Sequence, residues 1–563
     1  MTRTRIRLFL LVAGAAGNVW AQVSPPLPSE TRPGEKPLPL PEFRKPAPEL
    51  IELPPVKPPE AGRVPLGVRA TVRKFRITGN TAISDAELAK VAAPFENREL
   101  GTAELEELRR QLTLLYVNRG YINSGAVIPD QRITEGVVEI RIIEGRLTRI
   151  EVEGTEHFRA SYFSDRIALH AGPPLNMGEL EQGLQIRLRD PLVTSINAQL
   201  VPGERPGEAV LKTKIAEAPR YDLGASLDNK LSPSLGEAQL GLHGALRNLY
   251  GGGDVLTADI SGAEGIPYDL LVRYRAPLTA NDTTLGLYYE RAKSEVVQSP
   301  FDVLEITSEI ESFGLQLSRP VYQTASRDLL LGASLERRES KTSLLGVPFS
   351  FSPGVEDGKA TVAVLRLAQD FVDRGRDQVV AARSVFSFGL DAFGSTVHDD
   401  LPDSRFATWL VQFQWVRRLS ERGDQLHFRA SGQFANDSLL PIEQFSVGGL
   451  DSVRGFRTNQ LVRDNGYTAS LEYRLPLFAN PVGWRNLQLA AFADTGGAKN
   501  KEGANPTPTR LTGIGLGLVW SLGARYQAEL YFADGRTDVP EQPGHSLQDD
   551  GIHFRFVAFP MRP

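Results

Sequence analysis

The sequence predicts a transmembrane β-barrel of 16 antiparallel strands, preceded by two small α+β domains. From residue 220 onward, segments of about ten residues alternate apolar with polar side chains, as membrane β-strands do. The connections there alternate between short turns and long loops, as in outer-membrane barrels. Upstream of residue 220, a β-α-α-β-β pattern occurs twice, which indicates an internal repeat.

Composition excludes several classes of protein. The 563 residues include 63 Lys and Arg against 68 Asp and Glu, and this balance gives no reason to expect a nucleic-acid partner. There is no cysteine, which excludes disulfides and thiolate metal sites. Beyond the first residues, no run of about 18 apolar residues occurs, so a helical membrane protein is excluded.

The first 21 residues have the composition of a secretory signal. Arg3, Arg5 and Arg7 precede the apolar stretch 8–16, and a small-x-small site precedes Gln22. The alternative, an uncleaved anchor, needs a longer apolar stretch. Residues 22–69 are saturated with proline and predict an extended periplasmic arm without a core of its own.

The two repeats are predicted at residues 70–145 and 146–218. In the first, Ser84 and Glu87 predict a capping box at the start of a helix. Neither repeat contains a convergent set of histidines or paired carboxylates. We therefore expect binding modules, whose free edge strands can receive an extended peptide by strand addition.

The barrel is predicted over residues 219–563. In "YTASLEYRL", Leu471 and Tyr473 alternate with Ser470, Glu472 and Arg474. One apolar face and one charged face suit lipid outside and a watery lumen inside, whereas a soluble β-sandwich needs a dry core on the apolar side. Sixteen strands enclose a water-filled lumen. With the repeats entering from the periplasm, odd strands run outward, so the connection after strand eleven is external.

That external connection, residues 437–465, contains the first of two motifs. "SVRGF" supplies Val453, Arg454, Gly455 and Phe456. Two strands on, "FADTGG" supplies Phe492, Asp494 and Gly496. The motifs resemble the VRG(F/Y) and F-x-D-x-G motifs of the barrel superfamily that assembles or secretes outer-membrane proteins.

The resemblance implies a role for each motif. In that superfamily the loop folds back into the lumen and its arginine pairs with the wall aspartate, which here means Arg454 with Asp494. A guanidinium in a partly dehydrated lumen needs a carboxylate, and its planar fork suits one. Gly455 would permit a tight turn at the tip. An exposed loop with unrelated charges is the alternative.

The repeats narrow the family further. They resemble POTRA domains, and two of them, with "FRITGNT" and "LYGGGD", are similar to the two-partner secretion transporters of the hemolysin activation/secretion type. The resemblance implies an outer-membrane location, periplasmic POTRA domains, a large secreted partner polypeptide such as a hemolysin or adhesin, contact with outer-membrane lipid, and the barrel assembly machinery during biogenesis. Studied members carry a plug helix before the first POTRA domain; this arm is too rich in proline to predict one.

Other functions remain as alternatives. An assembly factor that inserts other barrels usually carries more POTRA repeats, and a solute porin leaves both repeats without a role. For a barrel-borne hydrolase, His398 beside Asp399 and Asp400 is the nearest candidate, and a solvated loop tip explains it better. No catalytic residue, cofactor or metal is predicted.

Overall fold

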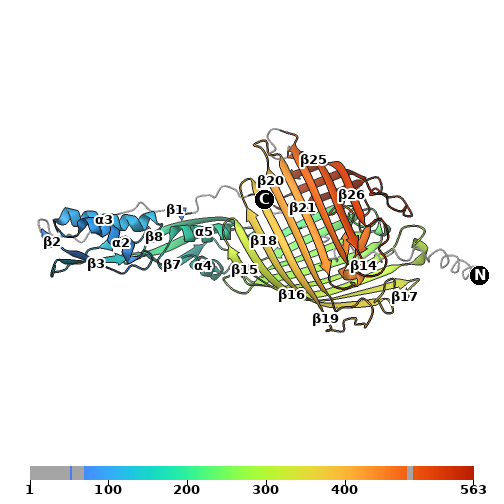
Figure 1. The fold of residues 1–563 in the computed structure, drawn as a ribbon, viewed down its shortest axis with the longest axis horizontal. Helices are drawn as coiled ribbons and strands as arrows, with labels where there is room; N and C mark the ends of the chain where they lie inside the picture. The colour runs from blue at the N-terminus through green and yellow to red at the C-terminus, as the bar shows by residue number, and fades with distance from the viewer. Residues whose placement is uncertain (1–37, 39–42, 44–50, 53–68, 479–485, 563) are drawn as a thin grey trace, which may run out of the picture. The chain divides into compact units, whose positions relative to one another are not determined.

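The computed structural model describes residues 38, 43, 51–52, 69–478 and 486–562 (Figure 1). The predicted signal segment lies outside the described residues, as does most of the proline-rich arm. The chain divides into two compact units, one containing Pro46–Pro219 with Asn248–Gly253 and the other containing the barrel. Among the described helices, none is both long and apolar enough to cross a membrane.

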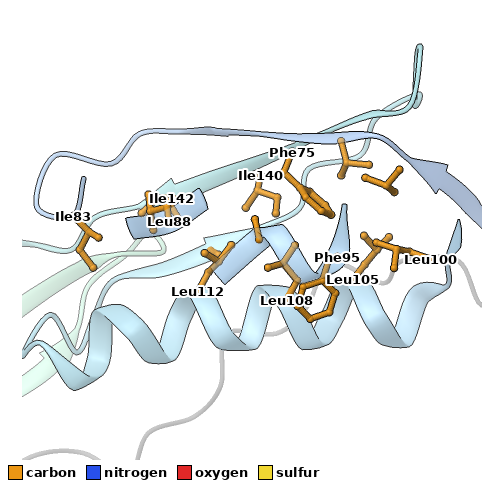
Figure 2. Packing of buried hydrophobic residues seen from close by; sticks show 14 of the residues in the cluster. Phe75, Ile83, Leu88, Phe95, Leu100, Leu105, Leu108, Leu112, Ile140 and Ile142 are labelled. Carbon is orange, nitrogen blue, oxygen red and sulfur yellow. The ribbon is translucent and has the colours of Figure 1, made fainter. Parts of the chain in front are cut away.

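The first small domain packs two helices on a sheet. Its elements are β2 (Ala70–Val72), β3 (Lys74–Thr78), α2 (Asp85–Ala92), a 3-10 turn η1 (Ala93–Phe95), β4 (Arg98–Leu100), α3 (Thr102–Asn118), β5 (Gly125–Val127) and β6 (Val137–Ile143). The sheet order is β3-β6-β5, with β3 parallel to β6. Leu105, Leu108 and Leu112 share one face of α3 and pack toward Phe75 and Ile140 (Figure 2).

The capping-box prediction for α2 is wrong. Ser84 is the N-cap residue but makes no side-chain cap hydrogen bond. Its hydroxyl instead donates to the Glu87 carboxylate at 3.3 Å, and both oxygens of that carboxylate accept from Arg119. The guanidinium therefore competes successfully for the carboxylate that a capping box requires.

The second small domain repeats the order of the first. It consists of β7 (Arg146–Glu153), α4 (Ala160–Ala168), α5 (Met177–Leu188), β8 (Val193–Pro202) and β9 (Glu208–Glu217). Its sheet has the order β1-β8-β9-β7. The outermost strand, β1 (Ile51–Glu52), comes from the proline-rich arm and pairs in parallel with Ala198 and Gln199 of β8.

In both domains, a glutamate at the end of the last strand accepts hydrogen bonds from backbone N–H groups of the first turn. Glu144 accepts the backbone N–H groups of Thr81 and Ala82 at 2.6 and 2.8 Å, and Glu217 accepts the equivalent N–H groups of residues 156–158 at 2.8 to 3.0 Å. Each turn has a glycine at positive φ, Gly79 at +86° and Gly154 at +81°. A Cβ on either would lie 2.5 Å from a carbonyl oxygen of the last strand, so only glycine fits.

The second unit is a closed antiparallel barrel of 16 strands, which confirms the predicted fold class (Figure 1). The strands are β10 (Tyr221–Asp228), β11 (Gln239–Arg247), β12 (Val255–Ala263), β13 (Ile266–Pro277), β14 (Thr284–Glu295), β15 (Thr307–Gln323), β16 (Arg327–Leu344), β18 (Lys359–Arg374), β19 (Gln378–Leu390), β20 (Ala407–Arg418), β21 (Gln425–Ala435), β24 (Asn465–Pro476), β25 (Leu487–Lys499), β26 (Arg510–Leu522), β27 (Tyr526–Gly535) and β28 (Ile552–Ala558). A short segment, β17 (Val347–Pro348), extends the hairpin of β16. Pairing of β10 with β28 closes the barrel.

The two faces of the barrel wall differ as the alternation predicts. In β24, Leu471 and Tyr473 are exposed on the outside, whereas Ser470 and Glu472 are buried. An outward apolar face is stable only against lipid or another apolar phase. The buried polar residues therefore mark the inner wall on which the lumenal loop packs.

Candidate functional site

The connection between β21 and β24 folds onto the inner wall of the barrel. It spans residues 436–464, one residue offset from the predicted 437–465, because Asn465 already pairs within β24. Within it lie the 3-10 turn η4 (Pro441–Glu443) and two short strands, β22 (Phe445–Val447) and β23 (Leu461–Arg463), which pair with each other. We call residues 436–464 the lumenal loop.

The structure brings Arg454 of the lumenal loop onto Asp494 of β25. The Arg454 Nε donates to Asp494 Oδ2 at 2.7 Å, Nη2 donates to Oδ1 at 2.9 Å, and the Arg454 backbone N–H donates to Oδ2 at 3.1 Å. Arg454 is 1% exposed and Asp494 is 2% exposed. A bidentate pair of this kind combines charge with a fixed orientation of the guanidinium plane.

Arg454 has further partners that the motifs did not predict. Its Nη1 donates to Glu472 of β24 at 2.5 Å, and its Nη2 donates to the Ser470 hydroxyl at 3.2 Å. Glu472 also accepts from Arg474 at 2.6 Å. Two arginines and two carboxylates thus meet in this cluster, so its formal charges balance.

Aromatic rings enclose the guanidinium. The Arg454 Cζ lies 3.5 Å from the centroid of Phe492 and 4.5 Å from that of Tyr531. The two rings meet edge to face, with an interplanar angle of 86°. The motif phenylalanine therefore supplies a cation–π contact to the same arginine that the motif aspartate binds.

The motif glycines permit the close approach of loop and wall. Gly455 has φ +88°, and a Cβ there would lie 2.9 Å from the backbone nitrogen of Gly535 in β27. Its N–H donates to His553 Nε2 at 3.0 Å. A Cβ on Gly496 would lie 2.6 Å from a methyl group of Val447 in the loop. Side chains at either glycine would push the loop off the wall.

Val453 and Phe456 fasten the tip by apolar packing. Both are buried in a cluster that includes Phe445 and Val447 of the loop and Leu511 of β26. The seven motif residues therefore lie together at one place on the wall. Their role in export stays a prediction.

Two other loop arginines bind neighbouring external connections. Arg457 makes a bidentate pair with Asp549, with Nε and Nη2 both 2.6 Å from its oxygens. Arg463 donates to the carbonyl oxygen of Ala498 near the end of β25 and to those of Pro506 and Pro508 in the connection that follows it. The lumenal loop is thereby tied to the connections that follow β25 and β27.

The described part of the proline-rich arm includes two residues in contact with β20. Leu38 is 7% exposed, and its carbonyl oxygen accepts from Gln414 Nε2 at 2.8 Å. The Arg418 guanidinium lies 4.8 Å from the centroid of the Phe43 ring. Leu38 also lines a cavity of about 80 Å³ between the lumenal loop and the wall. The arm thus contributes at least Leu38 to the filling of the lumen.

Sequence reasoning identified the arginine and its aspartate but missed Glu472 and Tyr531. The strand alternation placed Glu472 on the inner face, yet many polar residues share that face, and no spacing rule singles it out. The pairing register of the two strands explains why Glu472 joins the site. Ser470 of β24 pairs directly with Asp494 of β25, and Glu472 pairs with Phe492.

The chain matches two protein-family models and several known transporters. The family model described as haemolysin secretion/activation protein ShlB/FhaC/HecB matches residues 207–520, and the model of the ShlB-type POTRA domain matches residues 70–145. The outer membrane transporter CdiB of Dickeya dadantii is 24% identical over 461 residues, 80% of each chain. The hemolysin transporter protein ShlB of Serratia marcescens is 23% identical over 405 residues, 69% of each chain.

Solved structures show the same fold. CdiB from Escherichia coli superposes with a TM-score of 0.65 at 23% identity, covering 89% of this chain and 92% of that one. BamA from Haemophilus ducreyi lacking POTRA domains 1–3 gives a TM-score of 0.53 at 14% identity, covering 87% of this chain and 99% of that one. Barrel and POTRA architecture are therefore shared with outer-membrane proteins.

Proposed function

Because the chain belongs to the ShlB/FhaC/HecB family of haemolysin secretion/activation proteins, the outer-membrane transporters of two-partner secretion, we propose that it exports one large partner polypeptide through its barrel. It resides in the outer membrane, with its POTRA domains in the periplasm. The observation that carries the proposal is the buried Arg454–Asp494 pair, which holds a loop of 29 residues inside the lumen (436–464) instead of leaving it at the surface.

Strand addition supports the first step, capture of the partner in the periplasm. The edge of β8 already holds an extended segment, since Ile51 and Glu52 pair with it in parallel. Backbone N–H and C=O groups at such an edge bind any extended chain, whatever its sequence. An unfolded segment of the partner would bind here or at the free edge of the first domain. The arm must then leave β8 before the partner occupies that position.

Passage through the lumen is the second step. The inner wall and the loop present paired charges and hydroxyls, which an unfolded polar chain can contact without strong adhesion. The sequence shows no nucleotide-binding motif, and the periplasm supplies no ATP. Folding of the partner outside the cell would then make export irreversible. Assembly of the transporter itself would depend on the barrel assembly machinery.

A secretion assay tests this function. The polypeptide encoded beside the transporter gene is followed in medium and periplasm, with and without the transporter, while the amounts of unrelated outer-membrane barrels are measured in the same cells. The proposal expects the polypeptide to stay in the periplasm without the transporter and other barrels to be unaffected. Loss of other barrels would indicate an assembly factor, and unchanged secretion would refute export.

A further inference from the structure

A second cluster of buried charges fastens the other end of the lumenal loop. Glu443 is 0% exposed and lies at the end of η4, eight residues after β21. Its Oε1 accepts from Arg338 Nη1 of β16 at 2.8 Å and from Arg366 Nη2 of β18 at 2.9 Å. A carboxylate that is removed from water to this degree costs free energy unless cations compensate it, and here two do so.

The second cluster is fixed by more than charge. Arg338 Nη1 also approaches the Ile442 carbonyl oxygen at 3.3 Å, and Gln433 Nε2 donates to the Glu443 carbonyl oxygen at 2.9 Å. Beside it, Leu439, Leu440 and Ile442 pack into an apolar cluster with inner-wall residues of β15 and β18. The backbone of η4 and its carboxylate are therefore held together at one position of the wall.

The polarity of this cluster is the reverse of that around Arg454. At the tip, the loop supplies the cation and the wall supplies carboxylates; at η4, the loop supplies the carboxylate and the wall supplies cations. The strands β19, β20 and β21 separate β18 from β24 in the barrel. The loop is thus attached at two separated positions on the circumference and bridges the wall between them.

The wall arginine Arg366 at the second cluster also has partners outside the loop. Arg366 also donates to Glu336 at 3.1 Å and to the Ser387 hydroxyl at 2.8 Å, so it keeps a carboxylate and a hydroxyl if Glu443 departs. At the tip, among the described residues, Asp494 accepts hydrogen bonds only from Arg454, whereas Glu472 also accepts from Arg474 at 2.6 Å. Each site therefore has one wall group that keeps an oppositely charged partner without the loop, Arg366 at η4 and Glu472 at the tip.

We propose that Glu443 is a positioning residue, a second anchor that holds the root of the lumenal loop against β16 and β18 and thereby keeps the lumen closed. Two anchors of opposite polarity give the loop one closed position. Loss of the η4 contacts alone would free the root and its apolar residues while the tip stays attached. The inference concerns closure of the lumen and does not depend on which polypeptide is exported.

The test compares Glu443→Gln with Asp437→Asn in the purified full-length protein in planar bilayers. Both substitutions remove one negative charge from the same loop, but Asp437 is exposed. We expect channel openings about tenfold more frequent for Glu443→Gln, because charge-assisted hydrogen bonds are lost, and an unchanged frequency for Asp437→Asn. Glu443→Asp, which keeps the charge on a shorter side chain, should lie between them. Equal opening frequencies for Glu443→Gln and Asp437→Asn would overturn the proposal.

A labelling experiment reports on the root directly and needs no current. The chain has no cysteine, so Leu440→Cys introduces a single thiol at a side chain that is 0% exposed. In the double variant with Asp437→Asn, this thiol should react slowly with a hydrophilic maleimide. In the double variant with Glu443→Gln, it should react about tenfold faster. The heat-dependent shift of the folded barrel in gel electrophoresis confirms folding for each variant. Equal labelling rates in folded variants would refute the anchor, while loss of secretion in the separate assay concerns only the export function.

Discussion

Asp494→Ala is the substitution whose effect on the lumenal loop can be worked out most fully. It removes three hydrogen bonds to Arg454, at 2.7, 2.9 and 3.1 Å, and leaves that arginine with Glu472 and Ser470. Loss of one partner from a buried pair costs about 3 to 5 kcal/mol, and the retained Glu472 favours the lower figure. Since 1.4 kcal/mol is a factor of ten, about 3 kcal/mol raises the detached fraction of the loop tip about 100-fold.

Trypsin measures this fraction, because it cleaves after arginine and Arg454, Arg457 and Arg463 are all buried in the attached loop. When detachment is fast relative to cleavage, the cleavage rate follows the detached population. We expect cleavage within the loop to rise about 100-fold in Asp494→Ala, with the barrel still folded, and to stay unchanged in Asp437→Ala. Equal cleavage of the two variants would refute the claim that Asp494 holds the tip.

Three further predictions concern the same contacts and the periplasmic domains. Exchange of the charges, Arg454→Asp with Asp494→Arg, should not restore secretion, because Glu472 of the wall would then face the new aspartate. Secretion above half of the wild-type level would contradict this prediction. Gly496→Ala should cost about 1 to 3 kcal/mol of loop attachment by overpacking, seen as faster tryptic cleavage, whereas Gly432→Ala, with no atom closer than 3.6 Å to its Cβ, should not. Burial opposes ionisation of Glu144, but the N–H groups of the turn that it closes outweigh this and lower its pKa below 4.5. Protection of those amides from hydrogen exchange should therefore be complete above about pH 4.5 and decline as pH falls through the lower folded-state pKa, and Glu144→Gln should remove this dependence.

Much of the fold could be predicted because the bilayer imposes a strict pattern. Each membrane strand must present apolar side chains outward and polar side chains inward, so alternation, together with the pattern of short and long connections, predicted a barrel of 16 strands. The repeated domains could also be predicted, because the spacing of apolar residues differs between helices and strands. The capping box failed because a distant cation, Arg119, takes the carboxylate of Glu87, and a local motif carries no information about such a partner.

The site was predicted only in part, for a related physical reason. The Arg454–Asp494 contact came from resemblance, and the charge of the guanidinium made a carboxylate partner plausible. Glu443 with its two arginines gave no signal in sequence, because its partners lie 105 and 77 residues away and meet it only when the barrel closes. Leu38 likewise could not be placed, since a proline-rich segment specifies extension but not the surface along which it runs.

The most direct test of the export proposal is to trap a partner polypeptide inside the barrel. A partner with a stably folded domain at its trailing end should stall, and a photoreactive residue replaces either lumen-lining Gln412 or outward-facing Leu471. The account predicts that the stalled chain cross-links to position 412 and not to position 471. Secreted partner without any cross-link at position 412, with the barrel folded and the photoreactive residue incorporated, would contradict passage through the lumen.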